Sequence, residues 1–303
     1  MANRSSNRTG KKKEVVSNEN LRAETSKGNF FGDSHKVMMN VKPFLERYVL
    51  EVPNRVSQNR IAYIHQGAAR VKINFISYEL RKGDVLLIPS NYILVIESYS
   101  NDIEPWILEF NYGTMEEKEM VGIETIYFHM EERETTVLEY YFSLLSQIDN
   151  SAARTNEDVM HLVMSMIYYL HQMYDHRTGH SSWQKIPRAK QIKSEFVNMV
   201  VTLDNPPLTI AEYAKALHVS ENYLSIIIKN ETGQTVKKWI EQRTETQIKM
   251  LLADPKGRTL NEIADIIGYS SPPQVVRFFK RRTNMTPYEY RKMALKERAR
   301  LQE

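Results

Sequence analysis

The side chains with the clearest chemistry lie together in one short segment, SPPQVVRFFKRRTN. Gln274 and Arg277 are its polar residues nearest the start, and an arginine guanidinium can donate two hydrogen bonds to O6 and N7 of a guanine. A cationic run follows, which suits contact with phosphate and equally suits the C-terminal end of a helix. It consists of Lys280, Arg281 and Arg282. These residue types predict contact with a nucleic acid, and a phosphate contact or a solvated charge is the alternative for Arg277.

An internal repeat surrounds this segment. TIAEYAKAL begins at Thr209 and TLNEIADII begins at Thr259, at an offset of 50 residues. Both open with Thr-x-x-Glu, in which the threonine caps a helix start and the glutamate reaches back to the cap. Ala214 and Ala264 then occupy the position where a second helix must pass closely.

Each repeat continues through a short turn into a second helix. The turn residues that favour positive φ are His218 and Gly268. The following helices, ENYLSIIIKNETG and PPQVVRFFKRRTN, align at an offset of 51 residues. Helix, short turn and second helix is the helix-turn-helix plan, whose second helix enters the major groove of DNA. Two copies make this interpretation much stronger than one.

Flanking residues agree with this plan. Ser271 can cap the second recognition helix ahead of two prolines, which prefer a first helical turn. Thr286 and Glu289 form a further capping box, so the last helix could aim its free donors at phosphate. Between the copies, VKKWIEQRTETQIKMLLA predicts a rod that separates the recognition helices by nearly the roughly 34 Å of one duplex turn.

From about Lys190 to Lys292, the sequence resembles the DNA-binding domain of the AraC/XylS family of bacterial transcription regulators. The resemblance rests on LTIAEYAKALHVSENYLSIIIKNETG and LNEIADIIGYSSPPQVVRFFKRRTNMTPYEYR. Departures from the family pattern at packing, capping or anchoring positions leave the expected fold intact; they are Thr244, Val275 and Asn284. Ile226 stands where many relatives place a polar or basic residue, so the first module either contacts thymine methyl groups or mainly positions the protein.

The resemblance implies roles for individual residues. The predicted base-contacting residues are Asn222, Ser225, Ile226, Gln274 and Arg277. The predicted phosphate-contacting residues are Lys229, Lys280, Arg281, Arg282 and Thr286.

The N-terminal half predicts a different architecture. Residues 29–130 contain short β-rich runs separated by turn signals such as QGAAR and RKGD, which indicate a small antiparallel barrel or sandwich. The segment YELRKGDVLLIPS resembles the cupin-like sensor domain of the same family, and the His-x-His pattern of metal-binding cupins is absent. We therefore expect a metal-free barrel that binds an organic ligand or nothing.

Two amphipathic helices follow in residues 131–175. One face of the first holds Val137, Tyr141, Leu144, Leu145 and Ile148. In the second, Met160, Met164 and Tyr168 form a second apolar face, which favours a homodimer seam over simple coverage of the barrel. Residues 176–187 are predicted to be a linker, residues 1–28 a flexible basic tail, and residues 188–303 the DNA-binding domain.

Composition narrows the class of protein. The absence of cysteine excludes a disulfide framework, a thiolate zinc site and a cysteine nucleophile, and fits a reducing cytoplasm. No apolar run approaches the roughly 20 residues that span a bilayer, and no signal peptide is predicted. From residue 187 onward, 20 Lys and Arg face 13 Asp and Glu, which suits a polyanionic partner.

Together these features predict an α+β multidomain protein. An N-terminal cupin-like antiparallel β-barrel with a helical hairpin precedes an all-α domain with two helix-turn-helix motifs. The predicted function is sequence-specific regulation of transcription, with double-stranded DNA, a small-molecule effector and RNA polymerase as partners of an activator. No catalytic constellation, metal site or cofactor motif is found. An architectural DNA-binding protein of little sequence preference and a protein-interaction module are the alternatives.

Overall fold

A computed structural model describes residues 35–38, 45, 48–110, 126–149, 156–178, 187–203 and 206–300. The predicted basic tail and most of the predicted linker lie outside these residues. The strands are β1 (His35–Met38), β2 (Asn54–Arg55), β3 (Asn59–Gln66), β4 (Ala68–Ile73), β5 (Ile76–Arg81), β6 (Asp84–Ile88), β7 (Ile93–Tyr99), β8 (Glu104–Phe110) and β9 (Ile126–His129). The helices are α2 (Glu132–Asp149), α3 (Asn156–Thr178), α4 (Arg188–Val201), α5 (Ile210–Ala216), α6 (Glu221–Thr232), α7 (Val236–Ala253), α8 (Leu260–Ile267), α9 (Pro272–Thr283) and α10 (Pro287–Arg300).

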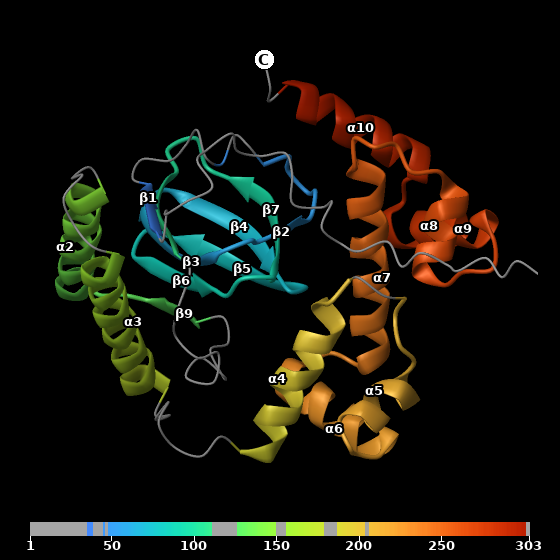
Figure 1. The fold of residues 1–303 in the computed structure, drawn as a ribbon, viewed down its shortest axis with the longest axis horizontal. Helices are drawn as coiled ribbons and strands as arrows, with labels where there is room; N and C mark the ends of the chain where they lie inside the picture. The colour runs from blue at the N-terminus through green and yellow to red at the C-terminus, as the bar shows by residue number, and fades with distance from the viewer. Residues whose placement is uncertain are drawn as a thin grey trace, which may run out of the picture. The chain divides into compact units, whose positions relative to one another are not determined.

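The described strands form two antiparallel sheets, in the orders β1-β8-β3-β6-β9 and β2-β7-β4-β5 (Figure 1). The two sheets pack face to face, with Ile64 and Leu86 from the first sheet meeting Ile73 and Ile96 from the second in one core. The antiparallel β fold predicted from the sequence is confirmed. Its strand pairs, as described, divide into two sheets and do not trace one closed barrel.

Two predicted turns depend on glycine. Gly67 has φ +79°, and a Cβ atom there would lie 2.7 Å from the Cα of Ile103. Gly83 has φ +88°, where an added Cβ would lie 2.8 Å from the ring of His129. Positive φ and close approach together leave glycine as the residue that fits both turns without strain.

Helices α2 and α3 cover the outer face of the five-stranded sheet (Figure 1). Leu138, Phe142 and Leu145 of α2 pack on outward-facing sheet residues. The face predicted for this helix was partly wrong, because Val137 and Leu144 are exposed. The apolar residues of this helix occupy more than one face, and helical spacing alone does not decide which of them the sheet covers. Helix α3 also continues to Thr178, beyond the predicted start of the linker.

The C-terminal helices form two copies of one module. Both predicted capping boxes are present: the N–H of Thr209 donates to Glu212 at 2.7 Å, and that of Thr259 donates to Glu262 at the same distance. Because each carboxylate accepts its threonine's N–H and hydroxyl, the pKa of both glutamates lies below the usual range. The predicted turns are confirmed as well, with φ of 55° at His218 and 73° at Gly268.

Helix α7 belongs to both modules. Trp239, in its first half, is fully buried in one core with residues of α4, α5 and α6. Ile248 and Leu252, in its second half, are buried in another core with residues of α8, α9 and α10. The predicted rod is therefore observed, and it is a shared wall of two separate cores.

Candidate nucleic-acid interface

The two recognition helices, α6 and α9, are fixed by their buried faces and their ends. Three residues of each helix lie in the module core; they are Leu224, Ile227 and Ile228 in α6 and Val275, Phe278 and Phe279 in α9. The helices end at Gly233 and Asn284, with φ of 70° and 59°, and each of these N–H groups donates to a carbonyl of the last turn at 2.9 Å. Asparagine thus takes the left-handed position that glycine would fill more easily.

The helix starts differ. Ser220 caps α6 by accepting the N–H of Tyr223 at 3.2 Å. The predicted side-chain cap at Ser271 is wrong, because this serine makes no such bond. Prolines at the first two positions of α9 leave Gln274 as its first N–H donor, and this group bonds the Ser271 carbonyl at 3.1 Å instead.

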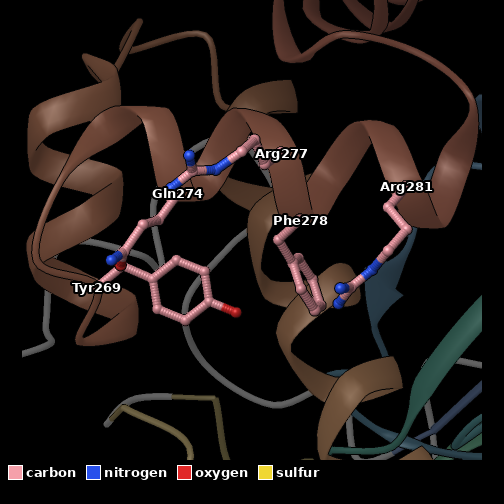
Figure 2. A pocket seen from close by; sticks show the side chains of 5 residues that line it. All are labelled: Tyr269, Gln274, Arg277, Phe278 and Arg281. Carbon is pink, nitrogen blue, oxygen red and sulfur yellow. The ribbon is translucent and has the colours of Figure 1, made fainter.

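The predicted base-contacting residues lie on the outward faces of both helices. Asn222 and Arg277 are exposed, Ser225 and Gln274 are half-buried, and Ile226 is 49% exposed. Around Arg277, the surface is hollowed between α9 and the preceding turn (Figure 2). The hollow is lined by Tyr269, Gln274, Arg277, Phe278 and Arg281.

The polar groups of this hollow are mainly donors. Because a backbone N–H can only donate, the side-chain atom of Gln274 that faces the Ser270 N–H at 3.3 Å must be its carbonyl oxygen. Its amide nitrogen is therefore left as a donor on the same side of the hollow as Arg277, whereas the guanidinium of Arg281 lies at the other end, beside Phe278. Guanine, which offers O6 and N7 as acceptors in the major groove, complements this set better than adenine does.

The predicted phosphate contacts fall into two groups. Lys229, Lys280 and Arg281 are exposed, and the Arg281 guanidinium lies 5.7 Å from the centre of the Phe278 ring. Two others have their donors engaged within the protein. The Arg282 guanidinium contacts Glu245 at 3.1 Å and Glu241 at 3.4 Å, both on α7.

Thr286 is the second engaged residue. Both its N–H and its hydroxyl donate to Glu289, at 2.7 and 2.8 Å, in the predicted capping box. Its hydroxyl also accepts the Glu289 N–H at 3.2 Å. The pKa of Glu289 lies below the usual range because its carboxylate accepts the Thr286 N–H. A negative charge therefore occupies the start of α10, where the sequence had predicted donors aimed at phosphate.

A buried polar pair joins α4 to α7. Arg243 and Gln247 are only 2% and 3% exposed, and they donate to the carbonyls of Thr202 and Leu203 at 2.8 and 2.6 Å. Arg243 also donates to the Gln247 carbonyl at 3.0 Å. Sequence reasoning misses this pair, because nothing in the local pattern distinguishes a buried arginine from the exposed cations around it.

Sequence reasoning also misses Tyr223 of α6. Its side chain is 47% exposed on the same helix as Ile226. The repeat is the signal that finds it, because the offset of 51 residues aligns Tyr223 with Gln274.

The N-terminal sheets enclose a small apolar cavity of about 60 Å³. Both sheets contribute to its lining, as Ile64, Leu86 and Ile96 illustrate. Arg60 is the charged residue of the lining, and it is held by Glu109 at 2.6 Å and by the Tyr48 hydroxyl at 2.7 Å. Among the described residues, no group of three or more His, Asp or Glu could hold a metal ion, and no helix is long and apolar enough to cross a membrane.

Comparisons with known proteins agree with this geometry. Residues 213–293 match the family model described as a helix-turn-helix domain. The C-terminal domain is a DNA-binding helix-turn-helix domain of the AraC type. The Msm operon regulatory protein of Streptococcus mutans is 22% identical over 242 residues, which cover 77% of this chain and 83% of that protein.

Two other similar proteins show how far the likeness extends. The uncharacterized HTH-type transcriptional regulator YtdP of Bacillus subtilis is 28% identical over 102 residues, which cover 34% of this chain. The chain spans only 13% of the length of that relative. The crystal structure of ToxT from Vibrio cholerae superposes with a TM-score of 0.45 at 14% identity, over 87% of this chain and 99% of ToxT.

The contacts of the AraC-type domain predict different effects for two neighbouring arginines. Arg282→Ala removes the cation that contacts Glu241 and leaves Glu245 with Lys249, which lies 2.9 Å away, so we expect the free energy of unfolding to fall by about 1 kcal/mol or less. Arg281→Ala should change the unfolding free energy by less than about 0.5 kcal/mol and should reduce the salt dependence of DNA binding by about one counterion. Urea denaturation and fluorescence anisotropy at several salt concentrations measure both quantities. An equal change in the salt dependence of DNA binding for the two variants would contradict the assignment of Arg281 to DNA and of Arg282 to ion pairs within the protein.

Proposed function

We propose that the protein is a sequence-specific DNA-binding regulator of transcription. One observation carries the proposal: two copies of one module, built on the single helix α7, each present an outward-facing second helix. A rod of 18 residues is about 27 Å long, which brings two such helices toward successive major grooves on one face of a duplex.

In this proposal, the two modules contribute unequally. Gln274 and Arg277 supply most of the hydrogen-bonded specificity, since both can donate to guanine. The first module contacts bases through Asn222, Ser225 and Ile226. Phosphate contacts come from the exposed cations Lys229, Lys280 and Arg281, whereas Arg282 and Thr286 hold the module together before DNA is bound.

We further propose that the protein is an activator working in the cytoplasm with RNA polymerase as its partner, as the family resemblance implies. The cavity between the N-terminal sheets supports a small-molecule effector. Its lining is almost entirely apolar, and the charge of Arg60 is already balanced by Glu109, so the ligand that fits best is small and uncharged.

A homodimer is also part of the proposal. The seam predicted from the sequence lies on α3, where Met160 and Met164 are half-buried and Tyr168 is exposed, so we place the seam on the more exposed stripe of α2. Val137, Tyr140 and Leu144 follow one another at helical spacing on the exposed side of α2, with Tyr140 72% exposed. Such a stripe is the seam that a second copy of the same helix covers in a symmetric pair. Such a dimer would also bring two DNA-binding domains to one operator.

Binding-site selection with the purified full chain tests the central proposal. We expect a bipartite site whose halves are centred about 10 base pairs apart, and a complex that survives an excess of random duplex. Arg277→Ala should cost about 1 to 3 kcal/mol and relax one base pair of the second half. An equal loss on every sequence would reduce Arg277 to a phosphate contact, and failure to enrich any sequence would favour an architectural protein.

The effector proposal predicts a selective stabilisation. A small uncharged apolar ligand present at 100 times its Kd should raise the free energy of unfolding by about 2.7 kcal/mol. Ala62→Leu fills the cavity and should remove this response, whereas Ala68→Leu adds the same carbons on an exposed strand position and should keep it. Thermal unfolding with a panel of such compounds measures both, and an unchanged response in Ala62→Leu would place the ligand elsewhere.

The dimer proposal predicts that charge on the stripe separates the subunits. Tyr140→Glu combined with Leu144→Glu should convert a dimer into a monomer, because like charges would face each other across the seam. Ser146→Glu, which lies about 120° or more around the axis of α2 from each residue of the stripe, is the matched control and should remain dimeric. Sedimentation velocity reports the outcome, and an unchanged mass for the double variant would exclude this seam.

A further inference from the structure

The two recognition helices share one register of outward-facing positions. Beyond the turn, the modules align at the offset of 51, and the hydrogen bonds at the ends of the two recognition helices are the same. The hydroxyls of Thr232 and Thr283 donate to the carbonyl four residues back, at 2.6 and 2.9 Å. Each also accepts the N–H of the residue two positions on, at 3.2 Å in both modules. Positions at this offset are therefore structurally equivalent.

This equivalence identifies the residues of α6 that correspond to the polar hollow of α9. Tyr223 corresponds to Gln274, and Ile226 corresponds to Arg277. Asn222 corresponds instead to Pro273, which has no group that can hydrogen-bond a base. The same part of the surface is thus polar and donating in the second module and apolar in the first.

About half of the surface of each of these two side chains is open to solvent. Tyr223 is 47% exposed and Ile226 is 49% exposed, three residues apart on α6. Side chains at this spacing lie about 5 to 6 Å apart, which spans one to two steps of about 3.4 Å along a DNA strand. The pair can therefore contact neighbouring bases of one strand.

The apolar group that a base edge offers in the major groove is the C5 methyl of thymine. We propose that Tyr223 is a specificity-determining residue of the first module and that, with Ile226, it recognises the methyl groups of thymines in the first half-site. This inference rests on the proposed function as a sequence-specific DNA-binding protein. Equivalent positions of the two helices then act differently: those of α6 contact methyl groups, and those of α9 donate hydrogen bonds.

Replacing thymine with deoxyuridine tests the assignment, because it removes the methyl group and keeps the base pair. The duplex is the one selected by the full chain, and the first half-site is the half that Arg277→Ala leaves unrelaxed. Each contacted thymine changed to deoxyuridine should weaken wild-type binding about three- to fivefold in fluorescence anisotropy. Tyr223→Ala and Ile226→Ala should bind the thymine duplex more weakly, and each should lose part of the preference for it.

Two controls isolate the effect of the methyl group. Asn222→Ala should keep the full thymine preference whatever its own affinity. Tyr223→Phe, which retains the ring, should keep the preference too, and circular dichroism verifies that each variant is folded. A wild-type preference near one, or a preference that survives Tyr223→Ala unchanged, overturns the role of Tyr223 while the selected site stands. Failure to select any site overturns the proposed function itself.

Discussion

The shared helix α7 is the constraint on which the rest of the DNA-binding domain depends. Trp239 anchors its first half in one core, and Ile248 and Leu252 anchor its second half in the other. Because a continuous helix resists bending, the separation and relative rotation of α6 and α9 are set by the number of residues between these anchors. Inserting or deleting a residue in α7 would rotate one recognition helix by about 100° relative to the other, so its length matters as much as its composition.

Polar interactions fix how the flanking helices meet this rod. The charge of Arg243 is buried where a cation would ordinarily cost several kcal/mol. It is compensated by the carbonyl of Thr202 at the C-terminal end of α4, where the helix dipole is negative, and by the side-chain oxygen of Gln247. Arg282 serves α9 in a comparable way through two carboxylates of α7. Both contacts are directional, whereas apolar packing alone would tolerate small rotations, so we assign them to orientation more than to net stability.

Local signals explain which parts of this structure the sequence could predict. The threonine–glutamate capping boxes, the turns at His218 and Gly268, and the glycine turns of the sheets depend on neighbouring residues, and all were found. One error and one omission both involve competition between hydrogen-bonding partners. Ser271 had the residue type of a cap, but the N–H of Gln274, which is the first donor after the two prolines, bonds the Ser271 carbonyl and not its hydroxyl. The ion pairs of Arg282 were not predicted, because its partners lie 37 and 41 residues earlier, beyond any local pattern; its phosphate contact stays a prediction.

The residues that build the fold are not the residues that face outward, and this explains how two modules of one fold can bind different base pairs. Residues that build the module, such as Thr232 and Thr283, face the backbone and keep the same bonds in both copies. Residues at the equivalent outward positions are exposed or half-buried and lie outside the module cores, so they can differ completely, as Ile226 and Arg277 do. In the first module, apolar side chains are exposed to water when no DNA is bound, and this exposure is unfavourable. Binding to a site whose thymine methyl groups cover Tyr223 and Ile226 removes this exposure, whereas other sites leave it in place. The exposed pair therefore discriminates between DNA sequences and does not merely add affinity.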